Sequence, residues 1–89
     1  MHDHYGLYYY PTAGNRRVRV YVKEEGGEVW FRLWSADDPK LWEDHGWVPH
    51  SAIRQAAAIY TGDNFDPLRA YDLELARALI AENDASNGA

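Results

Sequence analysis

Arg17-Val-Arg-Val-Tyr-Val-Lys-Glu-Glu-Gly-Gly-Glu-Val-Trp-Phe-Arg-Leu-Trp34 contains two alternating runs joined by a glycine pair. Gly26-Gly27 favours a hairpin turn of type I′, because both central residues of that turn need positive φ. The two runs then become neighbouring antiparallel strands. A shift of one residue would place valines beside tryptophans and arginines, so the pattern favours this register over its neighbours.

The alternation gives the predicted hairpin two faces of different chemistry. On one face Val20 lies opposite Leu33 and Val22 lies opposite Phe31, so this face is apolar and suited to a core. The opposite face carries rings and cations, with Lys23 across from Trp30, Tyr21 across from Arg32 and Arg19 across from Trp34. We call this second surface the aromatic face; its members are Arg17, Arg19, Tyr21, Lys23, Trp30, Arg32 and Trp34.

Segments on both sides of the hairpin predict the rest of the fold. The aromatic-rich run 5–10 has strand propensity, and it either pairs with the first hairpin strand or lies across the aromatic face. Proline and capping signals predict a short helix over 38–45, a helix from Pro49 to about residue 60, and a helix from Asp66-Pro67 to about Glu82. We therefore predict an α+β fold: a three-stranded antiparallel meander followed by two longer helices and one short helix, packed on one sheet face. The expected core is Val18, Val20, Val22, Phe31 and Leu33 with Ile53, Leu68, Leu75 and Leu79.

Length and composition indicate one small domain. The 89 residues predict a single unit over 1–84, and the small polar residues 85–89 predict a disordered tail. There is no cysteine, no signal-peptide pattern and no apolar run of about 18 residues, so we expect a soluble cytoplasmic protein without membrane contact. Asp72 falls on the apolar arc of the last predicted helix. There it is expected to bond a nearby tyrosine or arginine at the rim.

The net charge of −5 argues against binding to duplex DNA, because contacts to phosphates supply most non-specific affinity. The charge is uneven, however. Residues 1–34 carry five basic and four acidic side chains, and residues 35–89 carry four basic and ten acidic ones. The hairpin can therefore still present a local cationic patch.

The histidines and carboxylates do not form a recognisable catalytic or metal-binding motif. His2 and His4 flank an aspartate, and His45 and His50 flank a Gly-Trp-Val-Pro turn, but neither pair brings three or four ligands with metal-site spacing. No nucleophile elbow, phosphate loop or dinucleotide fingerprint is present. We expect no cofactor, no metal, no catalytic residue and no enzymatic role; a hydrolase-like site around His45 and His50 is the catalytic alternative.

The aromatic face is the best candidate for function. Its rings and cations can stabilise one another across the sheet, or they can be covered by Tyr8 or Tyr10 and by the segment 42–47. Trp, Tyr and Arg are also the residues that most often anchor protein interfaces. We expect a small non-enzymatic domain that binds a protein partner, or a second copy of itself, through this face. Binding of single-stranded nucleic acid, by stacking of bases on the rings, is the alternative.

Overall fold

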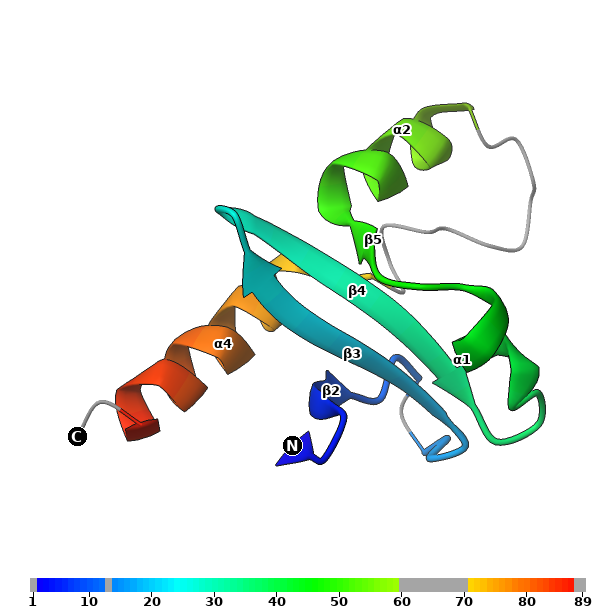
Figure 1. Ribbon diagram of the computed structural model, residues 1–89, viewed down its shortest axis with the longest axis horizontal. Coiled ribbons are helices and arrows are strands. Elements are labelled where there is room, and N and C mark those ends of the chain that lie inside the picture. Colours follow the sequence, from blue (N-terminus) through cyan, green and yellow to red (C-terminus); the bar gives the residue numbers. More distant parts are fainter. Residues whose placement is uncertain (1, 13, 60–70, 88–89) are drawn as a thin grey trace.

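A computed structural model describes residues 2–12, 14–59 and 71–87 of the chain (Figure 1). Its strands are β1 (His2–Asp3), β2 (Gly6–Tyr9), β3 (Val18–Glu25), β4 (Glu28–Ser35) and β5 (Val48–Pro49). Its helices are α1 (Lys40–Asp44), α2 (His50–Ile59) and α4 (Leu73–Asn87). The five strands form one antiparallel sheet in the order β1-β2-β3-β4-β5. The predicted α+β class is therefore confirmed.

The β3–β4 hairpin has the predicted turn and register. Gly26 and Gly27 have φ values of 62° and 79°, the left-handed conformation that the turn requires. Val22 pairs with Phe31, and Arg19 pairs with Trp34, as the alternation predicts. The aliphatic and aromatic faces are consequently real faces of this sheet.

The sheet has five strands rather than the predicted three. The first predicted strand is β2, which pairs with β3 through Leu7–Val22 and Tyr9–Val20 and so does not cross the aromatic face. The two additional strands, β1 and β5, contain two residues each. Strands this short leave no periodic signal in a sequence, which explains why the pattern did not reveal them.

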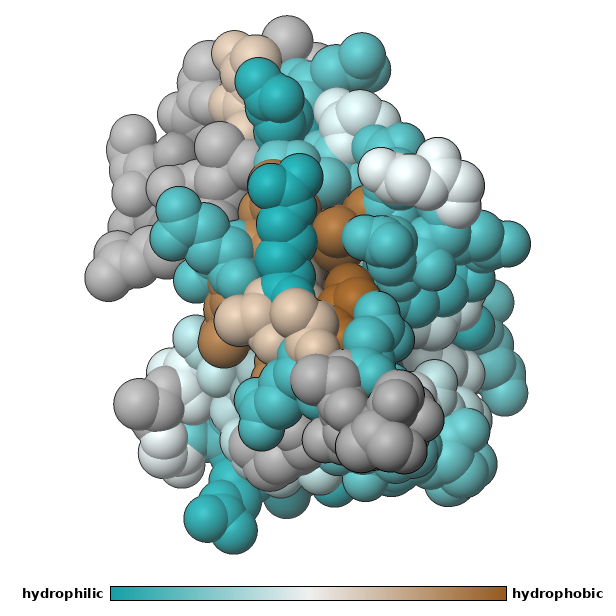
Figure 2. All heavy atoms as spheres, turned by 90° about the vertical axis from the view of Figure 1, so that its left-hand side faces the viewer, coloured by the Kyte–Doolittle hydropathy of each residue, from teal (hydrophilic) through white to brown (hydrophobic). Residues whose placement is uncertain are grey.

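The aliphatic face of the sheet forms the main core. Val20, Val22 and Phe31 are almost completely buried, together with Ile53 of α2 and Ala76 of α4. Helix α4 contacts β3 and β4, whereas α2 contacts β4 and β5. From the left-hand side of Figure 1 the surface is largely hydrophilic, and most of the strongly hydrophobic atoms that are visible lie near its centre, between hydrophilic side chains (Figure 2).

The last helix begins later than predicted. The expected start at Asp66-Pro67 lies outside the described residues, but Tyr71 and Asp72 are not helical and α4 begins at Leu73. The Asp72 carboxylate accepts a hydrogen bond of 3.1 Å from the backbone N–H of Leu75, so Asp72 caps the helix. The backbone N–H of Asp72 donates to the Tyr9 hydroxyl at 2.8 Å. Asp72 is thus a helix cap bonded to a tyrosine.

This later start also changes which residues of α4 enter the core. Ala76 is fully buried, whereas Leu75 is 39% exposed and its predicted place in the core is wrong. Leu79 and Ile80 pack against the core from the same helix. Leu68 lies outside the described residues. The helix ends at Asn87, beyond the predicted end near Glu82.

The short helix α1 lies beside β4 and packs its Trp42 on the aromatic face, not on the aliphatic face as predicted. Trp42 of α1 contacts the ring of Tyr21 and the guanidinium of Arg32, both of which belong to the aromatic face. In Figure 1, α1 and α4 flank the β3–β4 hairpin from different sides. The prediction that all three helices share one face is therefore wrong. Within the described ranges, none of the helices has both the length and the apolar character that a membrane span needs.

Candidate functional site

The centre of the aromatic face is covered by other parts of the chain. Tyr21 has an exposed fraction of 0%. The Tyr5 ring approaches it edge-on at 5.9 Å between centroids, the Trp42 ring does so at 5.1 Å, and Tyr5 and Trp42 lie 4.8 Å apart. Tyr8 of β2 adds a fourth ring at 5.3 Å from Tyr21. The aromatic face therefore contains a small aromatic core of its own.

Asp3 of β1 brings a carboxylate into this aromatic core. Its Oδ2 atom accepts a hydrogen bond of 2.6 Å from the Tyr21 hydroxyl and one of 3.1 Å from Nη1 of Arg19. The same Arg19 nitrogen lies 3.2 Å from the Tyr21 hydroxyl. The Asp3 and Arg19 side chains are 23% and 29% exposed, so this ion pair is only partly open to water. A pair in such a position is less screened by salt than an exposed one.

The pKa values of the two acidic groups move in opposite directions. Burial would raise the pKa of the Asp3 carboxyl, but hydrogen bonds from Tyr21 and from the backbone N–H of Tyr5, with the charge of Arg19, hold it below its usual value. Burial, together with the hydrogen bond to Asp3, raises the pKa of Tyr21 to about 12. At neutral pH the tyrosine is therefore the proton donor and the carboxylate is ionised.

Arg19 lies between two aromatic rings. Its guanidinium carbon is 4.8 Å from the centroid of Tyr8 and 4.8 Å from that of Trp34. Tyr10 extends the row, because its ring meets that of Tyr8 at 5.7 Å. These rings are half-buried, so one side of the row remains open to solvent. The row therefore presents aromatic rings on both sides of the Arg19 guanidinium, whose charge is already paired with Asp3.

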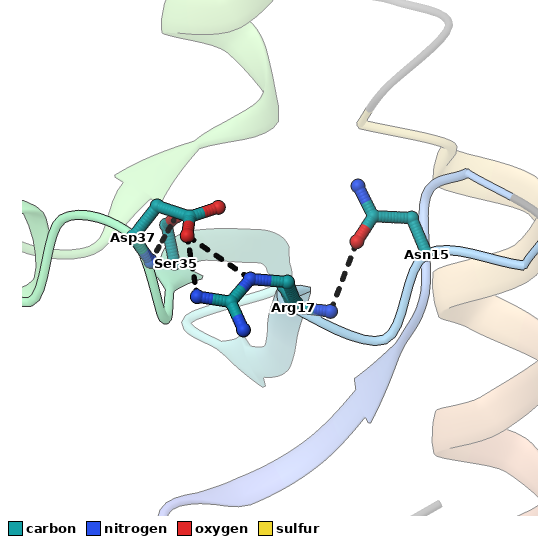
Figure 3. Close-up of polar contacts among 4 residues, drawn as sticks. All are labelled: Asn15, Arg17, Ser35 and Asp37. Atoms are coloured by element: carbon teal, nitrogen blue, oxygen red, sulfur yellow. Dashed lines mark hydrogen bonds and ion pairs between the residues drawn. The ribbon is translucent and has the colours of Figure 1, made fainter.

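The other cations of the aromatic face are also engaged within the chain. Arg17 donates through Nε to Asp37 at 3.0 Å, and this exposed pair links the segment before β3 to the segment after β4 (Figure 3). Lys23 pairs with Glu25 at 3.0 Å and lies over the Trp47 ring at 4.7 Å. Each cation of the face thus has an internal partner.

Arg32 and Trp30 complete the predicted set. The Arg32 guanidinium donates to the backbone carbonyl of Trp42 and stacks on the Trp42 ring at 3.8 Å. The indole N–H of Trp30 donates to the backbone carbonyl of Glu25 at 3.1 Å, and the Trp30 side chain is half-buried beside β5. The structure therefore brings all seven predicted residues to one face but leaves Tyr21 inaccessible.

Sequence reasoning named Tyr8, Tyr10 and the segment 42–47 as a cover, but it missed Asp3 and Tyr5. Asp3 is placed by the β1–β2 turn, in which Asp3 pairs with Gly6 and Gly6 has a φ of 129°. The backbone N–H of Tyr5 donates to the Asp3 carboxylate at 2.8 Å and holds this turn together. A glycine three residues after an aspartate is the only local signal of this turn, and it is a weak one.

The histidines lie apart from the aromatic core. His45 follows α1 as its C-cap, and His50 is the first residue of α2, where its ring lies 6.1 Å from that of Phe31. Burial and the charges of Arg54 and Arg77 lower the pKa of His50. In the part of the chain that the structure describes, no three His, Cys, Asp or Glu side chains gather as a metal site would require.

A cavity of about 340 Å³ opens on the aliphatic side of the sheet. Its walls include Leu33, Leu41, Val48 and Tyr71, and His45 also lines it. Pockets of this size hold small ligands in many proteins. Among the described residues the lining is mostly apolar, and Arg32, His45 and Tyr71 are its charged or titratable members.

Comparison with known protein families, with curated proteins and with solved structures finds no match. Function is therefore inferred from the site itself.

Acid should weaken the contribution of Asp3 to stability. The folded-state pKa of Asp3 is lowered, so its contribution is fully present above the unfolded value of about 3.9 and is lost as the pH falls through the folded value. We expect the difference in unfolding free energy between the wild type and Asp3→Asn to shrink as the pH is lowered from 6 towards 2. Urea unfolding at several pH values measures this difference. A difference that stays constant over the whole range would show that the charge of Asp3 is not involved.

Proposed function

We propose that this protein is a small, non-enzymatic interaction domain that binds a protein partner through the aromatic face. The observation that supports this most is the half-exposed row of Tyr10, Tyr8, Arg19 and Trp34. Rigid aromatic rings around an arginine supply large contact area with little loss of side-chain entropy, which is typical of interface anchors.

The internal ion pairs favour a protein partner over single-stranded nucleic acid. Arg17, Arg19 and Lys23 each face a carboxylate of the same chain, at 2.5, 3.1 and 3.0 Å. A nucleic acid whose phosphates follow the cations along the face would have to displace all three carboxylates, whereas a protein partner can leave most of these pairs intact, and the net charge of −5 opposes the approach of a nucleic acid. Without phosphate contacts, a nucleic acid would bind only by stacking its bases on the rings, and the side chains of a protein partner can make such contacts equally well.

Selection from a random peptide library against the wild-type protein tests this proposal. We expect the selected peptides to bind Trp34→Ala at least about tenfold more weakly, because truncation of an interface anchor costs roughly 2 kcal/mol. Thermal melting of Trp34→Ala should stay close to that of the wild type, since its stacking on Arg19 contributes only about 1 kcal/mol.

Leu75→Ala is the matched control, because Leu75 is an exposed apolar residue on α4, away from the aromatic face. This variant should bind the selected peptides as the wild type does. Equal affinity of Trp34→Ala and the wild type would contradict the proposal. Binding of a mixed-sequence oligonucleotide that weakens steeply with salt would favour nucleic acid instead.

A further inference from the structure

Asp3 and Tyr5 occupy a preformed site on the aromatic face. The carboxylate of Asp3 accepts from Tyr21 and Arg19, and the ring of Tyr5 lies against Trp42 at 4.8 Å. We call the residues that receive them, Arg19, Tyr21 and Trp42, the Asp3 site. It combines two donors for a carboxylate with an aromatic surface for a ring.

The Asp3 site requires a carboxylate. Tyr21 is fully buried and its hydroxyl keeps its proton at neutral pH, so it needs an acceptor. Arg19 is held between two rings, and its Nε atom is buried without a hydrogen-bond partner among the described residues. Without Asp3, the site would hold a poorly hydrated positive charge and an unsatisfied hydroxyl, both of which favour an incoming anion.

The segment 2–5 is attached to the sheet by few contacts. Strand β1 contains two residues, and its ladder consists of the pairs His2–Leu7 and Asp3–Gly6. Tyr5 is 46% exposed although it covers Tyr21. Besides this ladder, the segment is held by the bonds from Arg19 and Tyr21 to Asp3 and by the contacts of the Tyr5 ring with Tyr21 and Trp42. A short peripheral segment of this kind can open locally at a free-energy cost well below that of global unfolding.

We propose that the Asp3 site binds an acidic peptide segment of a partner protein, in which a carboxylate is followed two residues later by an aromatic ring. The segment 2–5 occupies the site in the free protein and shows the spacing that fits it. This inference rests on the proposed function and specifies the partner. The partner segment replaces Asp3 at Arg19 and Tyr21 and replaces Tyr5 at Trp42.

The internal segment competes with the partner because it is tethered beside the site. Tethering gives it an effective concentration in the millimolar range. Loosening the segment should therefore strengthen binding of an external peptide. The variant Asp3→Asn, Tyr5→Ala removes the charge and the ring while keeping the full chain and the backbone of β1.

The probe is the peptide HDHYGL, blocked at both ends, which copies residues 2–7. We expect the double variant to bind it at least about tenfold more tightly than the wild type does. HNHYGL and HDHAGL, which lack the carboxylate and the ring, should each bind at least about tenfold more weakly to the double variant. Asp84→Asn, an exposed change of the same type on α4, should leave the affinity at the wild-type value. Tryptophan fluorescence follows the titration.

The inference would be overturned if the double variant bound HDHYGL and HNHYGL equally well, if the wild type and the double variant bound HDHYGL equally well, or if the wild type formed a dimer that the double variant abolished. The last would assign the site to a second copy of this chain. If the double variant loses its near-ultraviolet circular dichroism and is therefore not folded, the single variant Asp3→Asn replaces it, and its affinity for HDHYGL is compared with that of the wild type. Library peptides that need Trp34 while HDHYGL fails to bind would refute this inference and leave the proposed function standing.

Discussion

Replacement of Phe31 by alanine is expected to lower the free energy of unfolding by about 3–5 kcal/mol. Phe31 is 1% exposed at the centre of the aliphatic core, and its ring meets that of Tyr71 at 5.6 Å. Truncation would remove these contacts and leave a void beside the existing cavity, which Phe31 also lines. Urea unfolding followed by tryptophan fluorescence measures the loss.

Leu75→Ala is the control for this prediction, since it removes an apolar side chain that is 39% exposed. We expect it to cost less than about 1 kcal/mol, as surface substitutions usually do. If Phe31→Ala were as mild as Leu75→Ala, the helices would not pack on the aliphatic face as described.

Tyr21→Ala is expected to destabilise the protein as strongly as Phe31→Ala, by about 3–5 kcal/mol, although the two residues lie on opposite faces of the sheet. It would leave a void under Tyr5 and Trp42 and remove the hydroxyl that binds Asp3. Tyr21→Phe keeps the ring and removes only the hydroxyl, so it should cost about 1–2 kcal/mol. The same urea unfolding measurement applies to both variants.

Trp34→Ala separates the two roles of the aromatic face, because Trp34 belongs to the half-exposed row and Tyr21 to the covered centre. A Tyr21→Ala protein that unfolds at the same urea concentration as Trp34→Ala would show that the centre of the aromatic face contributes little to folding. A large difference between them would show that this face is a second core with an accessible border.

The hairpin could be predicted from the sequence because its signals are local and agree with one another. The turn at Gly26-Gly27 fixes the register, and the two-residue period then assigns every side chain of β3 and β4 to a face. The aliphatic core followed from the same period. The same period places all seven residues of the candidate site on one surface.

The sequence offered Tyr8, Tyr10 and the segment 42–47 as one possible cover of the aromatic face, but it could not show that Tyr21 is covered or that Asp3 and Tyr5 take part, because these residues are distant in sequence and have no period. Asp3 and Tyr5 precede Tyr21 by a loop and a strand, and Trp42 follows it on a helix of five residues. The alternation of residue types along a strand is the same whether its polar face is exposed to solvent or covered by other residues. The burial of Tyr21 is thus a tertiary effect.

The start of α4 could not be predicted for a different reason. Asp66-Pro67 and Asp72 both carry capping signals, and Asp72 lies six positions after Asp66. The hydroxyl of Tyr9, a residue of β2, accepts the N–H of Asp72 and thereby favours a helix that begins at Leu73. With this start, the side of α4 that meets the sheet carries Ala76 rather than Leu75.

The two outermost strands have a consequence for behaviour at high concentration. β1 and β5 each offer two residues of backbone, and Pro49 of β5 has no N–H group to donate. Long, flat outer strands are the usual template on which copies of a protein add to one another and form fibrils. The outer strands of this sheet are poor templates of that kind, so we expect the folded protein to resist growth of fibrils from its sheet edges.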